Sequence, residues 1–144
     1  MKELSTLELR GHIERLYSRL KPLTVQDGVY KPLDDFWGNG TPNGQDGGFC
    51  YSDEQGYHYG VNERGKLITN VVTRSLEEIS YHVMSSDILN MAGIYEAKNR
   101  IEGQDFRRLW FKKILEYWSA IGEKYVRMAE QKLQQALAKA PFVD

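Results

Sequence analysis

The sequence predicts an α+β fold in which an N-terminal helix precedes a small three-stranded antiparallel sheet, and three C-terminal helices pack on that sheet. Apolar residues recur at helical spacing near both ends of the chain, whereas the middle holds short aromatic and β-branched runs separated by turn residues. The length of 144 residues is enough to bury a hydrophobic core without a disulfide or a structural metal. We therefore expect one compact domain over residues 1–144.

The first helix is predicted from about Ser5 to Leu20. Ser5 and Glu8 have the spacing of a capping box, in which each side chain accepts a hydrogen bond from a backbone N–H of the first turn. Pro22 predicts the end of the helix, because a proline removes a helical hydrogen bond and clashes with the preceding turn. The apolar stripe of this helix is formed by Leu9, Ile13, Leu16, Tyr17 and Leu20.

The segment 21–48 has no periodicity and contains Pro22, Pro32 and Pro42. Long irregular segments are uncommon in small domains and are usually functional or mobile. Apolar residues such as Val29 and Trp37 favour a loop that packs partly on the domain.

Three strands are predicted next, at Phe49–Ser52, Tyr57–Asn62 and Lys66–Thr73. Turn residues that include Gly56 and Gly65 separate them, and such short connections imply antiparallel pairing. Because side chains alternate along a strand, Tyr57 and Tyr59 should share one face of the sheet while His58 lies on the other.

The remaining residues predict three helices. Ser75 and Glu78 form a second capping box, and the helix that they begin should end before Gly103. Another helix is expected over about 122–140. Between them lies a helix with a broad apolar face, on which we expect Trp110 to be buried. That face is formed by Phe106, Leu109, Trp110, Lys113, Ile114, Tyr117 and Trp118.

Charge is distributed unevenly along the chain, although the formal net charge is only -1. Residues 21–62 contain two basic and six acidic residues, whereas residues 98–132 contain nine basic and five acidic residues. Each segment would therefore favour a partner of opposite charge, while the net charge itself says little about partners.

No enzyme signature is present: the chain lacks a phosphate-binding glycine loop, a nucleophile elbow and a zinc-binding HExxH motif. His12, His58 and His82 fall in different predicted elements. His58 is the least ordinary because it lies between two tyrosines, yet a packed or solvated strand histidine is the favoured interpretation. The glycine-rich stretch 43–48 does not fit the calcium-loop pattern. We expect no catalytic residues, no cofactor and no metal.

The location predicted from the sequence is the cytoplasm. The single cysteine, Cys50, has no partner for an intrachain disulfide. The first ten residues are charged and lack the apolar core of a signal peptide, and no apolar run is long enough to span a bilayer. We therefore expect no membrane contact.

Aromatic and acidic residues are interleaved between residues 27 and 59. Tyrosine and tryptophan provide rigid contact area in protein interfaces, and neighbouring carboxylates steer a basic partner. The alternative is that the aromatic residues pack the core and the acids lie in a solvated loop. The expected partner-binding residues are Asp34, Asp35, Trp37, Asp46, Tyr51, Asp53, Glu54 and Tyr57.

A basic flank on the C-terminal helices offers an alternative function. Arg107, Arg108, Lys112 and Lys113 have a charge pattern that would follow nucleic-acid phosphates. Acidic residues interleave with them and no nucleic-acid-binding motif surrounds them, so a solvated helix flank is favoured. The alternative is a small nucleic-acid-binding or regulatory domain; we expect no nucleic-acid partner.

Two stretches, 56–65 and 95–108, carry a specific resemblance. The first contains Gly-Tyr-His-Tyr and Glu-Arg-Gly, and the second reads Tyr-Glu-Ala-Lys-Asn-Arg-Ile-Glu-Gly-Gln-Asp-Phe-Arg-Arg. Together they resemble bacterial immunity protein family sixty-three, and the C-terminal residues 141–144 are similar to the ending of that family. The resemblance covers about residues 50–144.

This resemblance implies a non-enzymatic immunity protein, or antitoxin. Such proteins bind the C-terminal toxin domain of a cognate polymorphic or contact-dependent growth-inhibition toxin in the cytoplasm and neutralise it. Many of these toxins are nucleases with basic clefts, which an acidic and aromatic surface would complement by blocking the active site or an exosite. We expect the family motif to be mostly structural, because side chains beside a helix break commonly bind unpaired backbone groups. The motif residues that flank the break at Gly103 are Arg100, Glu102, Asp105 and Arg107.

Overall fold

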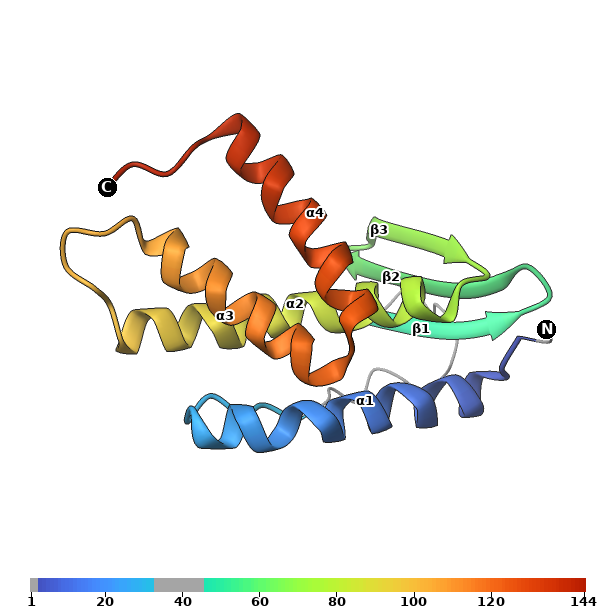
Figure 1. The fold of residues 1–144 in the computed structure, drawn as a ribbon. Helices are drawn as coiled ribbons and strands as arrows, with labels where there is room; N and C mark the ends of the chain where they lie inside the picture. The colour runs from blue at the N-terminus through green and yellow to red at the C-terminus, as the bar shows by residue number, and fades with distance from the viewer. Residues whose placement is uncertain (1–2, 33–45) are drawn as a thin grey trace. The chain divides into compact units, whose positions relative to one another are not determined.

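The computed structural model describes residues 3–32 and 46–144 of the chain. Its elements follow the predicted α+β order, with an N-terminal helix, an antiparallel sheet and then three helices (Figure 1). The predicted strands and C-terminal helices are confirmed, with ends that move by about two residues or fewer. In chain order the elements are α1 (Thr6–Gln26), β1 (Gly47–Asp53), β2 (Gly56–Glu63), β3 (Lys66–Thr73), α2 (Leu76–Lys98), α3 (Phe106–Ile121) and α4 (Glu123–Lys139).

The chain divides into two compact units. The sheet unit comprises residues 1–15 and 32–85, and therefore contains the first part of α1, the three strands and the first part of α2. The helical unit comprises residues 16–31 and 86–144, and contains the remainder of α1 and α2 together with α3 and α4. That residues 1–144 behave as one domain stays a prediction.

Helix α1 begins at the predicted capping box. The N–H of Ser5 donates to Oε1 of Glu8 at 2.9 Å, and the N–H of Glu8 donates to Oγ of Ser5 at 3.2 Å. The side chains of Leu9 and Ile13 on the next turns are fully buried. The capping box and the apolar stripe therefore act together at the start of this helix.

The predicted end of α1 is wrong, because the helix continues through Pro22 to Gln26. Pro22 removes only one N–H donor, and the buried side chain of Thr24 anchors the turn that follows. A left-handed glycine ends the helix instead: Gly28 has a φ of 72°, and the N–H of Val29 donates to the carbonyl of Thr24 at 2.9 Å. This is a Schellman motif, and it shortens the irregular segment predicted over 21–48.

The sheet is an antiparallel meander in the order β1-β2-β3. The first turn pairs Asp53 with Gly56. The second is a two-residue turn in which Arg64 and Gly65 have φ values of 51° and 77°. Positive φ at both central residues defines a type I′ turn, whose twist matches that of the flanking strands, and Gly65 adopts it without strain.

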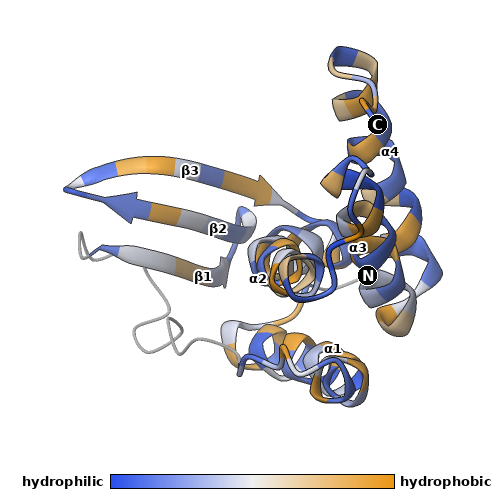
Figure 2. Ribbon diagram, turned by 90° about the vertical axis from the view of Figure 1, so that its left-hand side faces the viewer, coloured by the Kyte–Doolittle hydropathy of each residue, from blue (hydrophilic) through white to orange (hydrophobic). Residues whose placement is uncertain are grey.

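The two faces of the sheet have different surroundings. One face presents Ser52 and Tyr57, which bind the start of α1: Oγ of Ser52 donates to the Leu4 carbonyl at 2.6 Å, and the Leu4 N–H donates to the Tyr57 hydroxyl at 2.8 Å. His58 lies on the other face, opposite Tyr51 and Val72 in the register. The predicted separation of Tyr57 from His58 is therefore confirmed. Figure 2 shows hydrophobic stretches along β3 that are separated by polar residues.

In the helical unit, α3 and α4 pack through aromatic residues. The rings of Trp118 and Tyr125 stack with centroids 5.5 Å apart. The prediction that Trp110 is buried is wrong: its ring is partly exposed, and its Nε1–H donates to the carbonyl of Leu89 at 3.0 Å. Lys113 takes a buried position on α3 instead. Among the described helices, none is long and apolar enough to cross a membrane.

Candidate partner-binding site on the sheet

The β1–β2 hairpin brings two of the predicted partner-binding residues, Tyr51 and Asp53, together with His58 on one face of the sheet. The rings of Tyr51 and His58 stack with centroids 4.3 Å apart and an interplanar angle of 4°. Nε2 of His58 lies 2.7 Å from Oδ1 of Asp53. His58 is only 5% exposed, so its orientation is held by the ring on one side and by the carboxylate on the other.

The electrostatics of this cluster favour an ionised carboxylate. The hydrogen bond from His58 lowers the pKa of Asp53, and the N–H of Gln55, which donates to Oδ1 of Asp53 at 2.8 Å, lowers it further. Because an ionised carboxylate only accepts hydrogen bonds, Nε2 of His58 carries the shared proton. Partial burial raises the pKa of Tyr51, and the nearby charge of Asp53 adds to the effect.

A histidine beside an aspartate also occurs in hydrolase active sites, where it activates a nucleophile. The neighbouring hydroxyl and thiol of β1, on Ser52 and Cys50, project from the opposite face of the sheet. Burial raises the pKa of the Cys50 thiol to about 12, so it is not a thiolate at neutral pH. Within residues 3–32 and 46–144, no three His, Cys, Asp or Glu side chains come together as a metal site would need. Neither Ser52 nor Cys50 of β1 therefore offers His58 a nucleophile on its own face of the sheet.

A hollow of about 380 Å³ lies beside the stacked rings. Aromatic and aliphatic side chains and three amides line it, and such a mixture suits contact with a polypeptide surface, because the amides both donate and accept hydrogen bonds. The lining residues are Phe49, Tyr51, Gln55, His58, Asn62, Leu67, Asn70 and Val72.

Four of the predicted partner-binding residues lie on or beside the β1–β2 hairpin, away from the face that contacts α1. Tyr51 and Asp53 belong to the cluster, and Glu54 is exposed in the adjoining turn. Asp46 is exposed near the other end of the hairpin, where its Oδ1 accepts the N–H of Arg64 at 2.8 Å. The hairpin therefore groups Tyr51, Asp53 and Glu54, and places Asp46 apart from them.

The remaining predicted residues have different positions. Tyr57 is 3% exposed and faces α1, so its role in this conformation is packing. Asp34, Asp35 and Trp37 lie outside the described residues.

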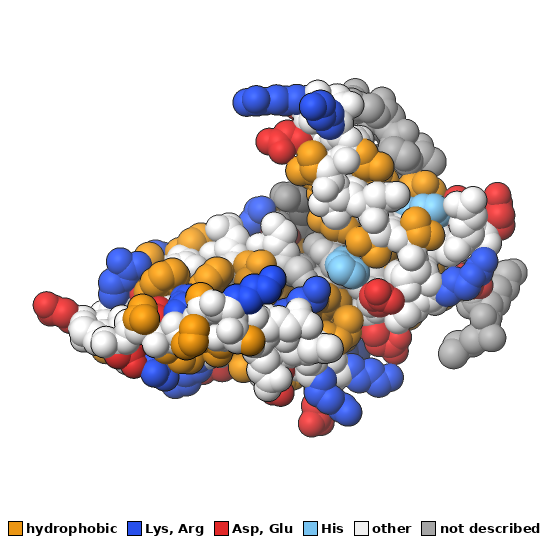
Figure 3. Space-filling view, turned by 90° about the horizontal axis from the view of Figure 1, so that it is seen from above, with side chains coloured by type: hydrophobic (Ala, Val, Ile, Leu, Met, Phe, Trp, Pro, Cys, Tyr) orange, Lys and Arg blue, Asp and Glu red, His pale blue; other side chains and the backbone are white. Residues whose placement is uncertain are grey.

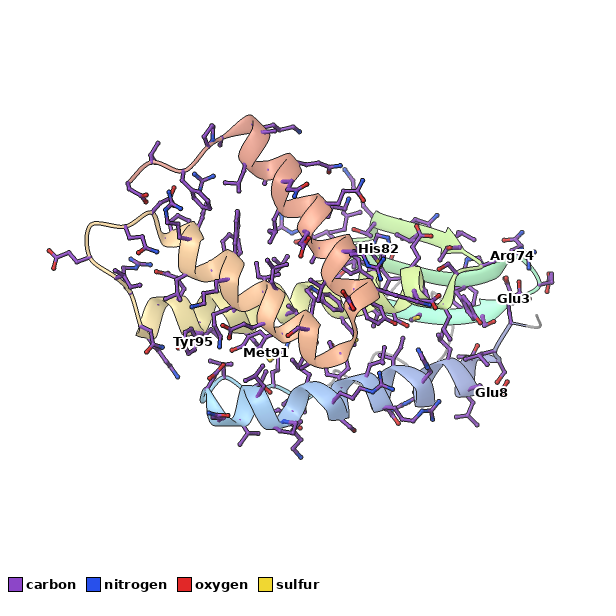
Figure 4. All side chains as sticks on the ribbon, in the orientation of Figure 1. Glu3, Glu8, Arg74, His82, Met91 and Tyr95 are labelled. Carbon is purple, nitrogen blue, oxygen red and sulfur yellow. The ribbon has the colours of Figure 1, made fainter. Side chains whose placement is uncertain are left out.

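Arg74 fixes the turn that carries Glu54. Its guanidinium donates to the carbonyl of Glu54 at 2.8 Å and forms an ion pair with Glu3, toward which it points in Figure 4. The Arg74 bond leaves the exposed side chain of Glu54 available to a partner.

The sequence analysis missed His58 as a member of the site. A two-residue turn pairs Asp53 with Gly56, and counting back from this pair places Tyr51 opposite His58. The length of the turn therefore fixes this pairing, provided that Glu54 and Gln55 form the turn. The contribution of β3 to the hollow had no comparable local signal.

The family motif at the start of α3 forms hydrogen bonds with the C-terminal residues. Asp105 caps α3 by accepting the N–H of Arg107 at 3.0 Å, and it also accepts the N–H of Val143 at 2.9 Å. The guanidinium of Arg107 donates to the carbonyls of Ala140 and Pro141 at 2.6 and 2.8 Å. The predicted structural role of these two motif residues is confirmed.

The other two motif residues differ. Arg100 forms a two-pronged ion pair with Glu96, four residues earlier on α2, at 2.8 and 3.0 Å. Glu102 is exposed.

Most of the predicted basic flank is engaged within the helical unit. Lys113 is buried and pairs with Asp27 and with a second carboxylate, so it does not belong to a solvated face. Arg107 binds backbone carbonyls, and Arg108 pairs with Asp144 at 2.7 Å. Lys112 is exposed. This arrangement leaves little of the flank for nucleic-acid phosphates.

Comparison with known protein families gives a match. The model of a family described as Immunity protein 63 matches residues 53–135, which is more than half of the chain. The matched range contains Asp53, His58, β3 and the motif at the start of α3. Neither the search of curated proteins nor the search of solved structures gave a match.

Proposed function

Because the chain belongs to the immunity protein 63 family, we propose that it binds and neutralises the C-terminal toxin domain of a cognate bacterial polymorphic or contact-dependent growth-inhibition toxin. It acts in the cytoplasm as a stoichiometric inhibitor rather than as an enzyme. The observation that carries the choice of surface is the Tyr51–His58–Asp53 cluster, which is held rigid beside an open hollow.

The cluster is suited to binding because it is ordered before a partner arrives. A side chain that is already fixed loses little conformational entropy on association, and an aromatic ring supplies a large contact area. Tyr51 is held by the stack, and Asp53 by His58 and Gln55. These contacts favour the sheet hollow as the centre of the interface.

The exposed acidic residues support a nuclease as the class of toxin. Asp53 and Glu54 are exposed next to the hollow, and Asp46 is exposed elsewhere on the sheet. Carboxylates at these positions, together with Asp34 and Asp35, would replace substrate phosphates in the basic cleft of a nuclease. We therefore propose a nuclease toxin that is blocked at its active site or at an adjoining exosite, with Trp37 and Tyr57 as further candidate contacts.

The test uses the catalytically inactivated toxin domain encoded beside this gene. Association and dissociation rates are measured with the wild type, Tyr51→Ala and Glu54→Gln at two salt concentrations, with growth protection as the biological readout. We expect Tyr51→Ala to weaken binding by about 10- to 100-fold and Glu54→Gln to slow association with a weaker salt dependence. Glu130→Gln on the exposed side of α4 is the matched control.

The opposite result is equally specific. If Tyr51→Ala and Glu54→Gln bind and protect like the wild type, while Lys112→Glu with Arg127→Glu abolishes protection, the interface lies on the helices and the toxin presents an acidic surface. Thermal melts of all variants establish that each remains folded. If the wild type does not bind the toxin domain, the proposed function itself fails.

A further inference from the structure

Strand β3 is an edge of the sheet whose outer side has no described neighbour. The strand order β1-β2-β3 leaves both β1 and β3 at an edge. The β1 edge is partly covered, because the N–H of Ser52 donates to Oγ1 of Thr6 at 3.0 Å. Along Lys66–Thr73, only β2 pairs with the backbone among the described strands. The pairing with β2 shifts register at Ile68, since Thr69 lies opposite Val61 and Leu67 opposite Asn62. On either side of this bulge, every second residue of β3 presents an unpaired N–H and C=O outward.

Apolar side chains of β3 are exposed along this edge. Leu67, Ile68 and Val72 are 52%, 56% and 49% exposed, although all three are apolar. The strand is eight residues long and contains no proline. A long, exposed and apolar edge is either a site of strand addition or an aggregation hazard. Figure 3 looks down on the β3 side of the sheet and shows hydrophobic side chains gathered over it.

A second copy of this chain is a poor occupant of the edge. The antiparallel self-pairing centred on Asn70 places Ile68 opposite Val72, but it also places Lys66 opposite Arg74 at both ends. Like charges directly opposite each other are destabilising. Shifting the register by two residues separates these charges, but then Ile68 or Val72 lies opposite the amide of Asn70.

A foreign strand meets the same edge without this conflict. An acidic residue placed beside Lys66 would pair with a cation that has no ion pair with any described residue. Apolar residues at alternate positions would cover Ile68 and Val72. Because Leu67, Asn70 and Val72 also line the hollow, one partner covers the edge and the hollow together.

We propose that the outer edge of β3 binds an extended segment of the cognate toxin domain as a fourth strand of the sheet. The segment carries an acidic residue beside Lys66 and apolar residues opposite Ile68 and Val72. This inference rests on the proposed function, and it deepens it by naming how the toxin is held: backbone hydrogen bonds provide affinity, and the alternating side chains provide specificity.

The experiment separates strand addition from the other uses of this surface. Ile68→Lys and Val72→Lys place charges on the edge at exposed positions, and Leu7→Lys is the matched control because Leu7 is 79% exposed on α1. The probe is the inactivated toxin domain encoded beside the gene. Binding is measured by calorimetry, and backbone amide hydrogen exchange of β3 is measured with and without the probe.

We expect each edge variant to weaken binding by about 30-fold or more, and Leu7→Lys by less than about twofold. Exchange of alternate β3 amides should slow by at least about tenfold in the complex, because strand addition places them in hydrogen bonds. Lys66→Glu should weaken binding further as salt is lowered, because it repels the acidic residue.

Three results would overturn the inference, and each of them identifies which premise is wrong. If the wild type binds the toxin while β3 exchange and the edge variants are unchanged, strand addition is wrong and the proposed function stands. If the edge variants convert a dimer into a monomer by light scattering without affecting toxin binding, the edge serves self-association and the proposal is overturned. If the wild type does not bind the toxin domain, the proposed function fails, and this inference fails with it.

Discussion

Replacing Lys113 with methionine is the sharpest test of how the helical unit is held together. The side chain of Lys113 is 5% exposed and its Nζ lies 2.7 Å from Oδ2 of Asp27 and 2.7 Å from Oε2 of Glu116. The ammonium also lies 4.2 Å from the ring centroid of Tyr95. These contacts connect the end of α1 to α3, so their loss should be visible in the stability of the whole unit.

The magnitude follows from the burial of Asp27. Methionine keeps most of the volume of the lysine, so the cost is electrostatic rather than a cavity. Asp27, whose side chain is 13% exposed, would keep a hydrogen bond from the Tyr117 hydroxyl at 2.8 Å but would lose its cation. Breaking a buried pair from one side costs about 3–5 kcal/mol, and the remaining hydrogen bond places the cost of Lys113→Met at about 3 kcal/mol.

The assay is urea unfolding at pH 7, with Lys112→Met as the matched control. Lys112 is the exposed neighbour on the same helix, and its replacement should change the free energy of unfolding by less than about 0.5 kcal/mol. The double variant Lys113→Met with Asp27→Asn should recover part of the loss, because neither charge then remains buried alone.

A pH series checks the same pair by an independent route. Although burial opposes the charged form, the bonds to Asp27 and Glu116 raise the pKa of Lys113 above its ordinary value. A raised folded pKa stabilises the fold fully below the unfolded pKa of about 10.4, and that stabilisation is lost as pH rises through the folded value. A change below about 1 kcal/mol for Lys113→Met, with no difference in alkaline stability, would contradict the buried-pair argument.

Two further predictions concern other parts of the fold. In the sheet, a Cβ added at Gly60 would lie 2.2 Å from a ring atom of Phe49, so Gly60→Ala should destabilise the protein by about 2–3 kcal/mol in a thermal melt, whereas Gly93→Ala has its nearest contact at 3.7 Å and should be neutral or stabilising. At the start of α3, hydrogen bonds from Arg107 hold the pKa of Asp105 far below its ordinary range. The stabilisation from ionised Asp105 is present above the unfolded pKa of about 3.9 and is lost as pH falls. The free energy of unfolding, measured from pH 7 to pH 2, should therefore depend less on pH in Asp105→Asn than in the wild type. Equal pH profiles would contradict the stabilising role of the Asp105–Arg107 contacts.

Much of the fold was predictable because its signals are local. The capping box at Ser5 forms within one turn of chain and is made in full. The one at Ser75 is made only in half: the N–H of Glu78 donates to Oγ of Ser75 at 3.1 Å, whereas the N–H of Ser75 donates to Oγ1 of Thr73 at 3.1 Å. Turn residues set the strand boundaries in the same way. Pro22 did not end α1 because a proline removes only one helical hydrogen bond, whereas the helix ended where a glycine could adopt a left-handed backbone.

The candidate site was predictable only in part. Aromatic and acidic composition indicated Tyr51 and Asp53, but the same criterion included Tyr57, whose side chain is buried on the opposite face. Alternation along β2 separates Tyr57 from His58, so composition without register mixes two faces of one sheet.

By itself the sequence determined the order of helices and strands, the antiparallel pairing and the family, because each depends on residues close together in the chain or on a contiguous motif. Only the tertiary structure decided which side chains became partners. The hairpin register places His58 against Asp53. Lys113, which was expected on the basic flank, instead pairs with Asp27, 86 positions earlier in the chain. Such pairings depend on which surfaces meet when the chain folds, and the free energy that selects them comes from burial. A local sequence pattern specifies only one of the two surfaces that become buried against each other.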